Sequence, residues 1–230
     1  GENQYLEYVY TMKPNDYMLD FDIQSQGLNT VLSTTKPANL DWSLKAFRNE
    51  KSVSYENRYA EIYFEHNDGK IDYAGTGNDT EDDAEKATFI AYKQHFFSSI
   101  LLTKTPFETV NFHSKSLVID EDKDTTFTKQ FESKIPLAYK NGELDYKMNW
   151  YYGPTEFETL KAYDQNLDKI IPLGWGVFGW INRLIFIPLF GFLSSYISYG
   201  IAIIIFTILI KLAMSPITFK SFLSQAKMKV

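Results

Sequence analysis

The chain has 230 residues, of which 44% are hydrophobic and 17% are aromatic, and it contains no cysteine. These proportions supply a packed core, argue against general disorder, and exclude disulfide bonds and thiolate metal sites. The formal net charge is −6, and an acidic chain repels a phosphate backbone, so nucleic-acid binding is not expected.

The charge is distributed unevenly along the chain. All 29 acidic residues lie within residues 1–169, whereas residues 170–230 carry five basic residues and no acidic one. This contrast predicts an acidic, water-soluble domain followed by a segment that inserts into a membrane. The first residues show no initiator Met and no signal region, so we expect the targeting element upstream of Gly1.

From about residue 5 to residue 150, short runs alternate aromatic or β-branched residues with charged ones. This alternation places one face of each strand on a core and the other in water, and it predicts an antiparallel β-sandwich over residues 1–153. The clearest runs are residues 58–66, 107–119, 125–139 and 143–152.

Turn residues separate these runs. Asn141-Gly142 predicts a hairpin between two strands, and Asn67-Asp68-Gly69 and Gly75 to Gly77 predict two further turns. The acidic run from Glu81 to Glu85 lacks the glycine-containing spacing of a calcium loop, so we expect it to form a solvated loop.

A connector helix and linker are predicted over residues 154–176. Gly153-Pro154 ends the strand pattern, and Thr155 followed by Glu158 forms a capping box for a helix over about 156–166. The spacing of Leu160, Tyr163 and Leu167 gives this helix one apolar face, which we expect to pack on the sheet or on the linker.

The remaining segment is apolar, and residues 184–210 contain no charged side chain. We predict an interfacial amphipathic helix over 177–197, a transmembrane helix over 198–217 and the start of a cytoplasmic loop over 218–230. The membrane-interface anchors of the first helix are Trp175, Trp180 and Arg183.

The basic residues that follow the predicted span indicate its orientation. Lys220, Lys227 and Lys229 form a basic flank, whereas the other flank leads to the acidic domain. The positive-inside rule therefore places the C-terminal end in the cytoplasm and the β-domain on the opposite, periplasmic side.

Lys211 is the candidate functional residue of this segment. It follows Tyr199 by about 18 Å of helix, past the middle of the bilayer. An ammonium at such a depth costs about 2.5–3.5 kcal/mol on insertion scales and normally faces a polar cavity or a partner. The alternative is that the Lys211 side chain snorkels to the cytoplasmic interface.

The rest of the chain offers no candidate active site, so we do not expect an enzyme. His66, His95 and His113 share no metal-ligand spacing, and no nucleotide or nucleophile motif is present. No cofactor and no metal site is predicted.

Three stretches resemble the YidC-type membrane protein insertases of the YidC/Oxa/Alb3 superfamily. They are AYKQHFFSSIL (91–101), YYGPTEFETLKAYDQNLDKIIPLGWG (151–176) and SYGIAIIIFTILIKLAMSPITFKSFLSQAKMKV (198–230). The third is similar to the first core helix of that family and the start of its cytoplasmic loop. Lys211 occupies the position of a groove residue that is usually Arg in Gram-negative members.

The resemblance implies a galactose-mutarotase-like supersandwich in the periplasm, on a multi-pass protein of the bacterial inner membrane. It also implies an insertase and chaperone whose hydrophilic groove receives nascent membrane proteins, alone or with subunits of the Sec translocon. Lys in place of Arg keeps the charge but loses the planar fork of donors.

Two other readings of the residues remain open. One is a membrane-anchored periplasmic module that binds a carbohydrate or a protein through exposed aromatics on the sheet. The other is a docking domain that contacts translocon subunits or chaperones.

Overall fold

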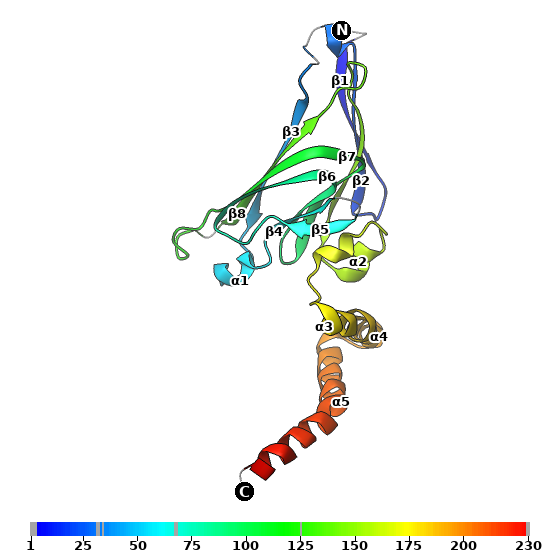
Figure 1. Ribbon diagram of the computed structural model, residues 1–230. Coiled ribbons are helices and arrows are strands. Elements are labelled where there is room, and N and C mark those ends of the chain that lie inside the picture. The colour runs from blue at the N-terminus through cyan, green and yellow to red at the C-terminus, as the bar shows by residue number, and fades with distance from the viewer. Residues whose placement is uncertain (1–3, 31–32, 34, 67–68, 125, 229–230) are drawn as a thin grey trace. The chain divides into compact units, whose positions relative to one another are not determined.

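The computed structural model describes residues 4–30, 33, 35–66, 69–124 and 126–228. Two compact units make up the chain, a β-rich unit (Gly1–Ile171) and a helical unit (Pro172–Val230). Figure 1 shows the strands of the first unit and the helices of the second. Each unit is considered by itself below.

The β-rich unit contains all the described strands and short helices between and after them. The strands are β1 (Tyr5–Met12), β2 (Met18–Gln26), β3 (Ala38–Phe47), β4 (Glu61–His66), β5 (Lys70–Tyr73), β6 (Asp79–Lys93), β7 (Phe97–Ser116), β8 (Phe127–Leu137) and β9 (Asp145–Pro154). The helices are the 3-10 turn η1 (Leu28–Thr30), α1 (Val53–Asn57), α2 (Phe157–Lys161) and the 3-10 turn η2 (Leu167–Ile170).

The strands form one antiparallel sheet that branches at β7. Its main path is β1-β2-β9-β7-β6-β4-β5, and β8 joins β3 to β7. One edge of β7 pairs with β6 over most of its length, while the other edge pairs with β9 over residues 97–103 and with β8 over residues 111–116. The predicted mainly β, antiparallel fold is therefore confirmed, and its two branches meet in one strand.

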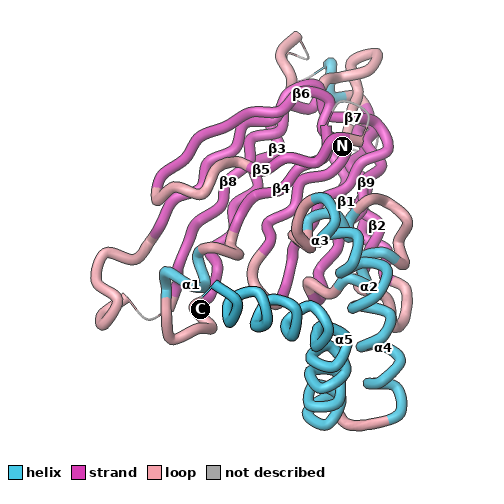
Figure 2. The backbone as a smooth tube through the Cα atoms, turned by 60° about the horizontal axis from the view of Figure 1, so that its bottom comes forward, coloured by secondary structure: helices cyan, strands magenta, loops and turns pink. Residues whose placement is uncertain are grey.

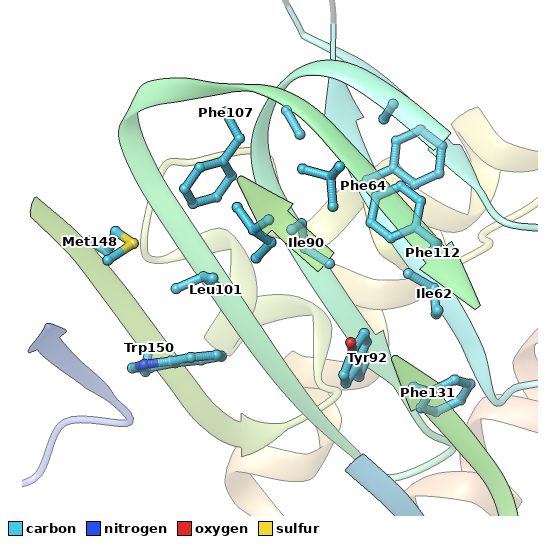
Figure 3. Close-up of a cluster of buried hydrophobic side chains, with 14 of the residues drawn as sticks. Ile62, Phe64, Ile90, Tyr92, Leu101, Phe107, Phe112, Phe131, Met148 and Trp150 are labelled. Carbon is cyan, nitrogen blue, oxygen red and sulfur yellow. The ribbon is translucent and has the colours of Figure 1, made fainter. Parts of the chain in front are cut away.

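The two branches face each other across the main core. Trp42 of β3 stacks on Tyr92 of β6 at 3.6 Å between ring centroids and contacts Trp150 of β9 at 4.6 Å, although β3 pairs with neither strand. Figure 3 shows core side chains from several strands, among them the stacked rings of Phe64 and Phe112. The branching thus produces the two-layered burial that a sandwich requires.

A bulge in the long β6–β7 hairpin lies where the two layers separate. Lys86 has a φ of 53°, and the register between the strands shifts between Ala87 and Phe89. The extra residues lie on β7, because Ala87 pairs with Phe107 and Phe89 pairs with Leu102, and such an irregularity bends the strand and strengthens the local twist. The hairpin can therefore contribute its far half to one layer and its near half to the other.

The opposite face of the sheet is covered by the connector. Leu160 of α2 and Leu167 and Ile170 of η2 are fully buried against the sheet residues Ile100 and Tyr151. The connector was expected to pack on the sheet or on the linker, and it packs on the sheet. Figure 2 shows α2 beside the sheet.

The predicted connector helix is too long at its C-terminal end, and its N-cap lies one residue after the predicted one. Its N-cap is Glu156 rather than Thr155, because the Glu156 side chain accepts the bond from the Thr159 N–H, while Thr155 bonds to Ser98. The helix ends at Lys161, since Asp164 and Asn166 adopt left-handed φ values of 53° and 60°.

The turn predictions have mixed outcomes. Asn141 and Gly142 have φ values of 52° and 82°, and Lys140 and Glu143 exchange both backbone hydrogen bonds, so the tight turn is confirmed. The hairpin is wrong beyond that turn, because β8 and β9 pair with different parts of β7. Gly75 also lies at a turn with positive φ, whereas residues 67 and 68 lie outside the described residues.

The acidic run Glu81 to Glu85 is part of strand β6 and not a loop. Its backbone pairs with β7, which places Glu81 opposite His113 and Asp79 opposite Lys115. Cross-strand pairs of opposite charge stabilise such a ladder, and the other acidic side chains project into solvent.

Candidate functional site in the apolar helices

The helical unit consists of two helical runs. The first comprises α3 (Gly176–Ile181), a π-helical turn η3 (Asn182–Phe186) and α4 (Ile187–Tyr196), and the second is α5 (Tyr199–Met228). Pro188 explains the π turn, because proline lacks the N–H that would continue the α-helical bonding. Two stretches, Gly176–Tyr196 and Tyr199–Gln225, are long and apolar enough to cross a membrane.

The two runs form an antiparallel helical hairpin. Only residues 197 and 198 separate α4 from α5, and Phe206 contacts both Phe186 and Phe190 at 5.6 and 5.8 Å between ring centroids. Phe190 also lies 6.2 Å from the Tyr199 ring. Outside this contact most of the unit's large apolar side chains are exposed, which is the reverse of a soluble core.

The first run begins at a tight turn that carries the predicted anchors. Trp175 and Trp180 are 87% and 58% exposed, and Arg183 is also exposed. Asn182 donates a side-chain hydrogen bond to the Leu173 carbonyl, and a Cβ on Gly179 would collide with the Gly174 carbonyl oxygen. The turn is therefore fixed by a polar side chain and by the close approach of two backbone segments.

Lys211 lies on α5 with its side chain exposed. It shares one face with three hydroxyl residues, Thr207, Ser215 and Thr218, which follow the i, i+4, i+8, i+11 spacing of a helical stripe. Thr207 and Thr218 donate to the Ile203 and Met214 carbonyls, at 2.8 and 3.0 Å. We call these four residues the polar stripe. The three hydroxyl residues were not predicted, although their spacing is legible in the sequence.

The helix continues beyond the predicted end of the span. Pro216 lies inside α5, and residues 218–228, which were predicted to start a loop, are helical. Figure 2 shows α5 changing direction along its length, as helices commonly do at an internal proline. Lys220 is exposed on this final part, whereas Lys229 and the side chain of Lys227 lie outside the described residues.

The histidines of the β-rich unit have structural partners. Nε2 of His113 lies 2.7 Å from Asp79 and Nδ1 lies 3.4 Å from Glu132, and the bond to Asp79 is the main reason the pKa of His113 is raised. His95 is stacked between Tyr59 and Phe96. The described residues contain no group of three metal-ligating side chains.

Two buried lysines of the β-rich unit were not predicted from the sequence. Lys93 and Lys129 are only 3% and 2% exposed, and Lys129 donates to the Ala60 carbonyl at 2.9 Å and Lys93 to the Tyr59 carbonyl at 3.1 Å. Burial lowers the pKa of both lysines, and the Glu61 carboxylate partly offsets this effect. Because their partners are backbone carbonyls that follow α1, these lysines fix the chain at that point.

The helical segment and the β-rich unit together match known proteins. The family described as YidC periplasmic domain matches residues 1–188. Three relatives named "Membrane protein insertase YidC" come from Azobacteroides pseudotrichonymphae (34% identity, 100% of this chain, 39% of the relative), Parabacteroides distasonis (33%, 100% and 37%) and Bacteroides fragilis (31%, 98% and 38%).

The similarity extends through α5, because each of these alignments covers essentially the whole chain. The chain spans about two fifths of the length of these relatives. An antiparallel β-rich unit, two apolar helical runs and a family match over most of the chain therefore agree, and the chain belongs to the YidC periplasmic domain family.

Proposed function

We propose that the full-length protein is an insertase of the bacterial inner membrane and that Lys211 helps to receive incoming membrane proteins. The observation that carries this proposal is the polar stripe on a helix that is otherwise apolar between Gly200 and Phe219. The Thr207 and Thr218 hydroxyls are satisfied by carbonyls of α5 itself, so the Lys211 ammonium is the group of this stripe for which lipid is the poorest solvent and which requires a polar surrounding.

The mechanism relies on solvation and not on covalent chemistry. A polar surface inside the membrane replaces hydrocarbon as the solvent for the hydrophilic flank of a substrate, while the apolar helix of that substrate moves into lipid. The positive charge of Lys211 attracts acidic or polar stretches. The partners are nascent membrane proteins, with the Sec translocon as a further partner.

Charge supports a particular orientation of the helical unit. Lys220, Lys227 and Lys229 occupy the cytoplasm and the acidic β-rich unit occupies the periplasm, in accordance with the positive-inside rule. If both apolar runs crossed the membrane, the β-rich unit and this basic flank would lie on the same side of the membrane, against the positive-inside rule. We therefore propose that only α5 spans the membrane and that the run from α3 to α4 lies at the interface.

The aromatic anchors fit this interfacial position. Trp175 and Trp180 are exposed and amphipathic, and such side chains concentrate at the level of the lipid headgroups. Arg183 provides a charge that reaches water from the same run. The chain has no cysteine, so a single cysteine at Ser221 tests the orientation by its reaction with an impermeant maleimide from the cytoplasmic side only.

The decisive experiment replaces Lys211 in the full-length protein. Lys211→Ala is expected to impair insertion of substrates while the β-rich unit stays folded, and Lys211→Arg is expected to retain activity because the charge remains. Lys220→Ala, beyond Pro216 on the same helix, is the matched control and should insert normally. Normal insertion of every tested substrate by Lys211→Ala would refute the role of Lys211.

A further inference from the structure

The β-rich unit exposes an aromatic surface at one end. Figure 1 shows α1, α2 and the start of β2 at the end opposite the N-terminus. Exposed rings gather there with fractions between 43% and 61%, and we call them the aromatic rim: Tyr17, Tyr55, Phe96, Phe97 and Tyr152.

The rim is continuous because its members share backbone and ring contacts. Tyr152 donates a backbone hydrogen bond to the Tyr17 carbonyl, and both residues line an open depression of about 390 Å³ together with Phe97. Phe96, next to Phe97, stacks on His95 at 4.3 Å, and Tyr55 lies 5.7 Å from the same imidazole. Five rings from four segments of the chain therefore line this end of the unit.

The chain reaches its apolar helices from the same part of the unit. Ile170 is fully buried in the cluster that contains Tyr151, whose ring lies 6.2 Å from Tyr17. Residues 171–175 connect Ile170 to the start of α3, and five extended residues span at most about 18 Å. A short tether therefore limits how far this end can lie from a bilayer that holds the apolar helices.

We propose that the aromatic rim rests on the phospholipid surface of the membrane in which the apolar helices insert. Tyrosine rings partition to the headgroup region, where an apolar body and a polar edge are both accommodated, and the phenylalanine rings add apolar area that the lipid surface removes from water. The charges beside the rim have mixed sign: Lys13 lies near Asp16, and Glu50 lies 3.2 Å from His95. Charges of both signs in proximity suit the zwitterionic headgroups of a phospholipid surface.

The absence of cysteine allows a direct test with single nitroxide labels. The full chain is reconstituted into phosphatidylcholine vesicles with a label at Phe97→Cys in the rim, at Tyr5→Cys near the N-terminus, or at Ile204→Cys on α5. Collision with oxygen, which concentrates in lipid, is compared with collision with a water-soluble nickel chelate. We expect the label at position 97 to lose nickel collisions relative to the label at position 5.

The control at Ile204 separates this inference from the proposed membrane insertion on which it rests. Lipid-like access at 204 with water-like access at 97 would overturn the inference alone. Water-like access at both positions would overturn the insertion of α5 and the inference with it.

A second set of variants distinguishes docking through the rings from simple tethering. Adding Tyr17→Ser and Tyr152→Ser to the chain labelled at 97 should raise the collisions of this label with nickel. These substitutions replace two aromatic rings of the rim by small polar side chains, which no longer partition to the lipid surface. Unchanged collisions would show that the tether alone sets the position, and this result would refute the proposal.

Discussion

The two units use the same kinds of apolar side chain in opposite ways. In the β-rich unit, Phe131 and Tyr92 are fully enclosed, and the strands bring them together from distant parts of the chain. In the helical unit, Ala202 is the only described residue that is fully buried, and large side chains such as Phe219 remain 65% exposed. Composition alone therefore does not specify a core, because the surrounding solvent decides which packing is stable.

The largest expected effect comes from one of two phenylalanine substitutions that test this contrast. Phe131→Ala removes a fully buried ring of β8 that lies 5.3 Å from the Tyr92 ring, and we expect a loss of about 3–5 kcal/mol in the free energy of unfolding. Phe219→Ala, at an exposed position of α5, should leave that free energy unchanged. Denaturant unfolding in detergent, followed by near-UV circular dichroism, measures both, and equal losses would contradict the contrast.

A smaller effect is expected from the polar contact inside the main core. The Tyr92 hydroxyl donates to the Trp42 carbonyl at 2.9 Å and lies 2.7 Å from the Ser133 hydroxyl, so it joins the two layers. Tyr92→Phe leaves these buried groups unpaired and should cost about 1–3 kcal/mol. Tyr8→Phe, at an exposed position of β1, is the control. A stability of Tyr92→Phe equal to that of the control would show that the bond is dispensable.

In the helical unit, two glycines allow a matched comparison. Gly179→Ala would place a methyl group against the Gly174 carbonyl oxygen, and such overpacking typically costs about 1–3 kcal/mol. Gly191→Ala has open space on α4 and should stabilise the helix by about 0.5–1 kcal/mol. Amide hydrogen exchange over residues 173–181 should accelerate in the first variant only; unchanged exchange would mean that the turn can relax.

The smallest effect concerns pH. Because the folded pKa of His113 is raised, chiefly by Asp79, its charged form stabilises the β-rich unit at pH values below about 6.5, the unfolded value. That contribution is lost as the pH rises through the folded pKa. The groups are partly exposed, so we expect less than about 1 kcal/mol.

The difference in unfolding free energy between the wild type and His113→Gln should therefore shrink from pH 5 to pH 8, and Asp79→Asn should reduce the same pH dependence. His66→Gln is the control. A difference that stays constant over this range would exclude protonation of His113 as its source.

The sequence by itself determined the features that depend on local periodicity and composition. Alternation in 125–139 predicted β8, the turn at Asn141-Gly142 followed from the φ values those residues tolerate, and the charge-free residues 184–210 predicted the apolar helices. The candidate Lys211 stood out because an isolated charge in an apolar stretch is visible without any fold, and its role stays a prediction.

Tertiary structure alone decided which segments meet. One edge of the 20-residue strand β7 pairs with both β9 and β8. These two strands therefore pair with β7 and do not form the predicted hairpin with each other. Glu81 to Glu85 became part of a strand because residues 109–113 of β7 pair with their backbone. Lys129 lies in the interior because carbonyls beyond α1 accept its ammonium. Pairing across long sequence separations satisfies both the hydrogen-bonding groups of the backbone and the buried charges. Local sequence patterns do not encode such distant partners.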